Sequence, residues 1–367
     1  MVAYLGANYA GLQRNPGQIT VESVLFEAVG KAGGVAECNS DSFEKVHWQS
    51  CARTDKGVSA AGNVIGLKII ESPDLKSKIN AALPQDIRVL DIRPVGKRFN
   101  PKNRCSSRYY TYLLPTYLFA PSKIHQGDKT APFVFDPEAI NAVLKYFEGS
   151  HNFHNFTSKS GPKEFNNPSA NRYIMSAKCS KPILYDGQEW TKITLLGQSF
   201  VLYQIRKMVG LTICIVRDGA NPRIILSCFE KPKKPLPTAP ALGLFLNRCN
   251  FDDFNKFNDN QLDWKSNEQE MENFIDNVIA PSIVQKDKDH NVFNGWKEII
   301  ETYPLDYEYL YSTVESQDKQ ESKLDQLEIG EEEELTKYKP TNPPPTSTPV
   351  PPPTSTPPPT LDQPQQD

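Results

Sequence analysis

The chain has 367 residues, room for two domains and tails, but its 38% apolar content is low for a wholly folded chain. No apolar run approaches membrane-spanning length, and no glycine-rich phosphate loop, dinucleotide fingerprint or metal-ligand cluster is found, which argues against membrane, nucleotide-driven and metal-dependent classes. The net charge of −3 hides an asymmetry, because residues 1–250 carry 32 Lys and Arg against 19 Asp and Glu, whereas residues 251–367 carry 9 against 25. A basic body favours a polyanionic partner, with ordinary surface charge as an equal alternative.

Residues 1–104 form the first predicted segment, an α+β half that carries a charged loop. Its patterns predict a helix over 20–33 and strands over 46–52 and 63–70. The loop Cys51–Ala60 lies between the strands and places Asp55 where a side chain can be aimed outward. Arg53 and Lys56 favour the ionised carboxylate that a nucleophile requires. On spacing alone, a solvated surface turn is the more common explanation.

Residues 105–250 form the second predicted half, connected to the first by the basic stretch Lys97–Arg104. Its patterns predict strands over 108–114 and 190–197, and helices over 137–147, 199–216 and 222–229. Strands and helices mixed without regular βαβ alternation predict the α+β class. Arg206 interrupts an apolar run, so it belongs either to an exposed stripe or to a buried pair with a carboxylate.

Residues 251–311 form a predicted helical extension, and residues 312–367 a predicted disordered tail. Two apolar stripes, over 271–279 and 296–303, predict helices too short for a coiled coil. The tail contains Glu331–Glu334, and its residues 340–367 hold 12 of the 31 prolines, so extended polyproline II is expected there. Its Pro-Pro-Pro segments could bind SH3- or WW-type domains, but a solvated linker is the favoured interpretation.

Candidate metal ligands are few. The seven cysteines are an odd number without a Cys-x-x-Cys pair, which predicts neither a disulfide framework nor a zinc site and favours a reducing compartment. His151 and His154 have a spacing that can bind metal, but the interleaved Phe153 and Phe156 favour a packing motif. We therefore expect no metal.

Several segments resemble the TruA family of tRNA pseudouridine synthases, in the form of its eukaryotic pseudouridine synthase 1 branch. The loop Cys51–Ala60 is closely similar to the family's catalytic loop. Other matches follow in the family's order: Ala3–Asn15, Ser107–Tyr112, Gly149–Thr157, Phe200–Gly210 and Ala239–Leu244. The resemblance implies two ferredoxin-like halves joined through a continuous antiparallel sheet, with a central RNA-binding cleft.

The resemblance also implies roles for individual residues. Asp55 aligns with the family's nucleophile, Arg206 with the arginine that pairs with it, and Tyr110 with the tyrosine that stacks on the target base. Arg53 matches the arginine that fills the space left by the extruded nucleotide. RNA contacts are expected from a set of basic residues: Arg53, Lys56, Lys102, Arg104 and Lys207. We expect Lys207 to be solvated or to face phosphate. The implied isomerisation is redox-neutral, and no cofactor is expected.

The implied function is conversion of uridine to pseudouridine in tRNA, with small nuclear RNA and messenger RNA as further candidate substrates. A catalytically silent RNA-binding or RNA-chaperone protein of the same fold is the alternative, but the presence of Asp55, Tyr110 and Arg206 favours the enzyme. A monomer is the favoured state, with no membrane partner. Met1 leads directly into a strand-like segment, so a nuclear or cytoplasmic protein is expected, with a mitochondrial location open if the N-terminus is truncated.

Overall fold

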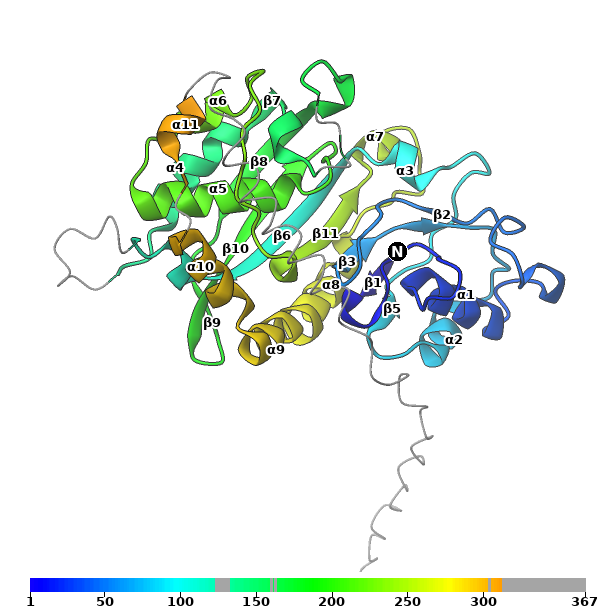
Figure 1. Cartoon of the computed structure of the whole chain (residues 1–367). Coiled ribbons are helices and arrows are strands. Elements are labelled where there is room, and N and C mark those ends of the chain that lie inside the picture. The colour runs from blue at the N-terminus through cyan, green and yellow to red at the C-terminus, as the bar shows by residue number, and fades with distance from the viewer. Residues whose placement is uncertain (123–132, 159–160, 162–163, 303–304, 312–367) are drawn as a thin grey trace, which may run out of the picture.

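The computed structural model describes residues 1–122, 133–158, 161, 164–302 and 305–311. Figure 1 shows a large sheet that runs through the molecule, with helices packed against it. The mixture of strands and helices agrees with the predicted α+β class. The predicted disordered tail, residues 312–367, lies outside the described residues.

Nine strands of the described residues form one sheet, in the order β5-β1-β3-β11-β6-β10-β8-β7, with β9 paired to β10. A further pair, β2 and β4, stands apart from this sheet. The strand bounds are β1 Val2–Tyr4, β2 Gln49–Ser50, β3 Ser59–Asn63, β4 Ile65–Gly66, β5 Ile87–Val89, β6 Ser107–Pro115, β7 Gly149–Asn152, β8 Asn171–Cys179, β9 Ile183–Tyr185, β10 Gln188–Gly197 and β11 Leu244–Asn250.

Strand β11 joins the two parts of the chain. It runs parallel to β3, with Leu246 opposite Ala60, and antiparallel to β6, with Leu246 also opposite Tyr110. The predicted antiparallel sheet is therefore wrong at this junction, and the sheet is mixed. No hairpin links β3 to β11, so no tight turn requires these two strands to be antiparallel.

Helices cover the sheet along its length (Figure 1). The pair α1 and α2 packs near the β5 edge, α4 packs on β8, and α8 packs on β3. The α-helix bounds are α1 Val21–Lys31, α2 Leu75–Ala82, α3 Pro101–Arg104, α4 Pro137–Leu144, α5 Gln204–Asp218, α6 Ile224–Ser227, α7 Asp252–Asn255, α8 Glu268–Phe274, α9 Ala280–His290, α10 Val292–Thr302 and α11 Tyr307–Tyr311. Among the described residues, no helix is both long and apolar enough to cross a membrane.

The strand after the Asp55 loop differs from the prediction of a strand over 63–70. Strand β3 ends where that prediction begins, and β4 contributes only Ile65–Gly66. Small residues make up most of β3, so it lacks the β-branched pattern that predicts a strand. The packing explains the small side chains, because a Cβ added at Gly62 would lie 2.8 Å from the carbonyl oxygen of Asn247 on β11.

The predicted helix over 199–216 begins later than expected, at Gln204. Tyr203, which precedes it, has a left-handed backbone with φ of +68°, so the chain turns there before the helix starts. The helix predicted over 222–229 is also shorter, covering only Ile224–Ser227 in α6.

The C-terminal extension contains more helix than the two apolar stripes predicted. Helix α8 continues through a π-helical stretch, Ile275–Ile279, into α9. Asn291 then adopts a left-handed conformation with φ of +52° and separates α9 from α10. Helix α9 has an exposed polar face, so a search for apolar stripes does not predict it.

Candidate active site

A tight turn presents Asp55 at the start of β3. The Val58 amide donates to the Asp55 carbonyl at 3.1 Å, which closes the turn. Gly57 occupies its third position with φ of +81°, a backbone geometry that favours glycine. The sequence Asp-Lys-Gly-Val thus folds locally into a turn that holds the carboxylate outside the strand.

Buried polar contacts support this turn from the sheet side. The Tyr4 hydroxyl lies 2.8 Å from Thr54 Oγ1 and accepts from Asn63 Nδ2 at 3.1 Å. The same Asn63 amide bonds both backbone groups of Ala52, accepting from its N–H at 3.3 Å and donating to its carbonyl at 2.8 Å. Tyr4 and Asn63 are fully buried, so these bonds fix the residues on either side of Arg53.

A second segment packs directly on the turn. The Leu12 amide donates to the Thr54 carbonyl at 3.1 Å. Gly11 has φ of +94°, and an added Cβ would lie 3.2 Å from the same carbonyl oxygen, so this approach requires glycine. The segment Ala3–Asn15 therefore supports the Asp55 loop.

Arg206 is a buried residue on α5, only 5% exposed. Its Nε donates to the Ala239 carbonyl at 2.6 Å, and its guanidinium lies 4.8 Å from the centre of the Tyr203 ring. The left-handed backbone of Tyr203 places that ring one turn before Arg206. Of the two alternatives for Arg206, the buried residue is the one observed.

Burial and charge act in opposite directions on Asp55. Its side chain is exposed, yet the surrounding protein removes enough hydration to raise the pKa of its carboxyl group. Arg206, and to a smaller extent Arg53, favour the anion and oppose this rise. A carboxylate with this balance has lost part of its hydration but can still ionise.

Tyr110 lies on β6, two strands from the Asp55 loop. Leu246 on β11 stands between them, opposite both Tyr110 and Ala60. The Tyr110 ring packs edge-on against Phe200, with ring centres 5.3 Å apart. Burial raises the pKa of its hydroxyl group, so the phenol stays protonated at neutral pH. Its neighbour Tyr109 is also half-buried, with its ring centre 5.3 Å from the Arg248 guanidinium.

The basic residues divide into two groups. Four are exposed: Arg53, Lys56, Lys102 and Arg104. Lys207 is only 8% exposed, so the prediction of a solvated side chain is wrong. The reason is that α5 is enclosed around most of its circumference, which leaves adjacent positions 206 and 207 both buried.

The two histidines pack against neighbouring groups. The His151 ring stacks on Phe229, with ring centres 4.2 Å apart and planes 8° from parallel. His154 is buried, with its Nδ1 2.9 Å from the Asn152 Oδ1. These contacts agree with the packing interpretation of the pair.

Within the part of the chain that the structure describes, one group of side chains could hold a metal ion. The thiols of Cys51, Cys105 and Cys249 lie within 4.8 Å of one another. Spacing in the sequence gave no indication of this cluster, because its members come from the Asp55 loop, the segment after α3, and β11.

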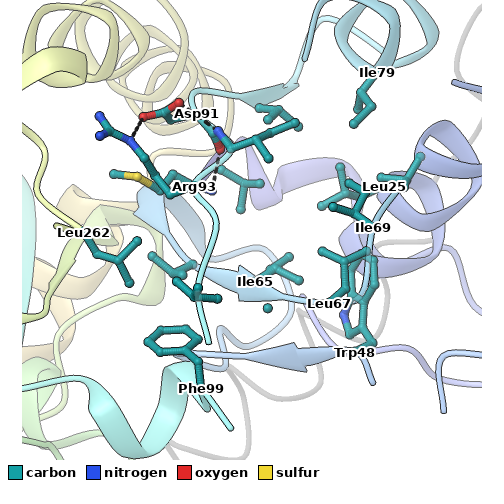
Figure 2. Close-up of a pocket in the computed structure, with 18 residues that line it drawn as sticks. Leu25, Trp48, Ile65, Leu67, Ile69, Ile79, Asp91, Arg93, Phe99 and Leu262 are labelled. Atoms are coloured by element: carbon teal, nitrogen blue, oxygen red, sulfur yellow. Dashed lines mark hydrogen bonds and ion pairs between the residues drawn. The ribbon is translucent and has the colours of Figure 1, made fainter. Parts of the chain in front are cut away.

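A separate apolar cavity of about 90 Å³ is lined by residues of the first half and by Leu262 of the C-terminal extension. Figure 2 shows Trp48, Ile65 and Leu67 on its wall, with Asp91 and Arg93 at one side, joined by an ion pair of 2.5 Å. None of the predicted site residues lines this cavity. It is therefore distinct from the site around Asp55.

Comparisons with known proteins connect this site to a family. A family profile described as tRNA pseudouridine synthase matches residues 143–252. The human pseudouridylate synthase 1 homolog is 39% identical over 314 residues, which cover 83% of this chain and 72% of the human protein. The chain belongs to the tRNA pseudouridine synthase family. Its relatives include tRNA pseudouridine synthase 1 of Saccharomyces cerevisiae, 35% identical over 83% of this chain and 71% of the yeast protein.

This family membership confirms the predicted resemblance to the TruA family and its pseudouridine synthase 1 branch. In this tRNA pseudouridine synthase family member, the charge of Arg206 favours the Asp55 anion, and Tyr110 lies two strands from the Asp55 loop. The sequence interpretation missed the supporting residues Tyr4 and Asn63. An isolated tyrosine and asparagine have no distinctive spacing, so only the fold reveals them.

Proposed function

We propose that this protein converts uridines in tRNA to pseudouridine, with Asp55 as the nucleophile. The observation that carries the proposal is an Asp55 carboxylate held on a supported turn, whose anion is favoured by the charge of the buried Arg206. Family membership supplies the reaction class, since the relatives' names are those of pseudouridine synthases.

The reaction breaks the bond from uracil N1 to the ribose and forms a bond from C5 to the same ribose carbon. The hydrogen on C5 leaves as a proton, and N1 gains one, so atoms balance without a cofactor. Asp55 attacks a carbon of the target nucleotide, at either the ribose or the base. Arg206 favours the anion that this attack needs, and the protonated Tyr110 supports the base edge-on or by stacking.

The basic residues would hold the RNA and replace the displaced nucleotide. A base inside a stem cannot reach Asp55, so the nucleotide is flipped out, and the exposed Arg53 fills the gap with its planar guanidinium. Exposed Lys56, Lys102 and Arg104 contact phosphate. We also propose that the two parts of the sheet form ferredoxin-like halves with the RNA cleft between them.

The test uses tRNA transcripts whose uracil carries tritium at C5. Formation of the new carbon–carbon bond expels that hydrogen, so the protein should release tritium into water and leave pseudouridine in the digested RNA. Sequencing the modified transcripts would then identify the positions. Tight tRNA binding with no tritium release from any transcript would contradict the proposal and favour an RNA-binding protein.

A further inference from the structure

Three cysteines that are distant in sequence meet behind the Asp55 loop. The Sγ atoms of Cys51, Cys105 and Cys249 lie within 4.8 Å of one another, and all three are free thiols. Cys51 lies in the bend four residues before Asp55, and Cys105 follows α3. The cluster therefore connects the catalytic loop with the chain that crosses between the two halves.

The three thiols differ in access to solvent. Cys51 is 2% exposed and Cys249 is fully buried, whereas Cys105 is partly exposed. A small solute therefore reaches Cys105 first. The buried pair lies directly behind it, within reach of any group formed on its sulfur.

A basic side chain lies beside the cluster. Arg108 of β6 pairs with Cys249 of β11 across the sheet. The same Arg108 donates to the Cys51 carbonyl at 3.1 Å, so its position is held by the loop itself. A thiolate is the form of cysteine that reacts with oxidants, and access decides which thiolate does.

We propose that Cys105 and Cys51 are an oxidation-sensitive pair whose disulfide turns off the Asp55 site, with a hydroperoxide as the oxidant. The Cys105 sulfur attacks one peroxide oxygen and gives up its proton, the O–O bond breaks, and the second oxygen leaves as water, which gives a sulfenic acid on Cys105. The Cys51 sulfur then attacks the Cys105 sulfur and loses its proton, and water leaves. Two thiols are oxidised, and one hydrogen peroxide is reduced to two waters.

Cys51, and not Cys249, forms the disulfide with Cys105, because the backbone at Cys51 can shift more readily than the backbone at Cys249. Cys51 and Cys105 both lie outside regular strands, whereas Cys249 lies in β11, opposite Arg108 of β6 in the central sheet. A disulfide needs its sulfurs about 2 Å apart, so thiols separated by up to 4.8 Å must approach each other. The two segments outside strands can move more readily than the central strand.

The consequence for Asp55 follows from the contacts around Cys51. Its N–H donates to the Val64 carbonyl at 2.8 Å and its carbonyl accepts from Arg108, so displacement of Cys51 strains both bonds that hold the start of the loop. A shift of about 1 Å in a reacting group can cost as much as 100-fold in rate. We expect turnover to fall by about tenfold or more, an effect that rests on the proposed function of Asp55.

The test starts from full-length Cys38→Ser protein, which lacks an exposed thiol outside the cluster. Hydrogen peroxide is added, remaining thiols are alkylated, and peptides are mapped by mass spectrometry without reduction. We expect a Cys51–Cys105 cross-link, a loss of tritium release of about tenfold or more, and recovery with dithiothreitol. Cys105→Ser and Cys51→Ser should both keep their activity after hydrogen peroxide is added. Cys214→Ala, which removes a buried thiol outside the cluster, should still lose activity.

Peptide mapping does not use catalysis, so it tests the disulfide even if the protein lacks the proposed activity. Melting curves identify any variant that fails to fold. If Cys51→Ser fails to fold, Cys105→Ser is used instead, because Cys105 is only partly buried. The proposal is overturned if the cross-link does not form, if Cys105 pairs with Cys249 instead, or if the cross-linked protein stays fully active. It is also overturned if the thiols react only after a chelator is added, since they would then hold a metal ion.

Discussion

Replacing Arg206 by methionine removes a charge and its donors while roughly preserving volume, and two effects follow from the structure. The Ala239 carbonyl loses a 2.6 Å hydrogen bond, and leaving such a group unsatisfied costs about 1–3 kcal/mol of unfolding free energy. Asp55 loses the larger of the two charges that oppose its burial. Its pKa therefore rises further, and the anion becomes scarcer at neutral pH.

Turnover by Arg206→Met at neutral pH should fall by about 10²–10³, the range for losing one preorganised charge contact at a reacting group. The rate should recover in part as the pH rises, because the anion then forms without the arginine. Single-turnover pseudouridine formation at saturating protein, from about pH 6 to pH 9, measures the profile. Denaturant unfolding measures the loss of stability.

Arg217→Met is the matched control, since it changes another buried arginine of the same helix. Arg217 bonds Glu301 of α10 at 2.9 Å, so its loss should destabilise the fold without moving the pH profile. An Arg206→Met protein with the parent's rate across the whole pH range would refute the pairing with Asp55. Weaker RNA binding and a smaller salt dependence, with an unchanged saturating rate, would instead identify a phosphate contact.

Three further substitutions have predicted effects on stability. Tyr4→Phe leaves Thr54 Oγ1 without its buried partner, so unfolding free energy should fall by about 1–3 kcal/mol and turnover per folded molecule should fall too. Thr20→Ala removes the N-cap of α1 and should cost about 1 kcal/mol in denaturant titrations, with turnover unchanged. Burial raises the pKa of Asp55 in the folded protein, so the folding stability of the parent falls as the pH rises from the ordinary carboxyl pKa through the folded pKa. The melting temperature of Asp55→Asn should therefore be higher than that of the parent at neutral pH. Below the ordinary carboxyl pKa, where Asp55 is protonated in both states, the two melting temperatures should be equal.

Local patterns predicted several elements well. The helix predicted over 137–147 begins at Pro137 and ends as α4 at Leu144, and the Asp136 carboxylate caps it by accepting from the amides of Glu138 and Ala139 at 3.0 and 3.1 Å. The strand predicted over 108–114 is β6 with one residue added at each end. These elements follow from neighbouring residues alone, which is why a single sequence is enough to predict them.

Features that depend on distant contacts could not be predicted in this way. Strand β3 is built from small residues because β11 packs closely against it, and its pattern by itself does not favour a strand. The hydroxyl of Tyr4 and the amide of Asn63 meet across 59 positions. Arg206 was recognisable as either a buried or an exposed charge, but the choice between them depends on how α5 packs, which its own residues do not determine.

The most direct measurement is pseudouridine formation by Asp55→Asn protein in excess over tRNA, beside its affinity for the same tRNA. Asparagine keeps the shape of the side chain and removes the anion, and RNA affinity rests on phosphate contacts elsewhere. The expected result is no pseudouridine after a time in which the parent protein completes the reaction, with tRNA bound almost as tightly. Conversion of the tRNA at a rate near that of the parent would show that Asp55 is not the nucleophile.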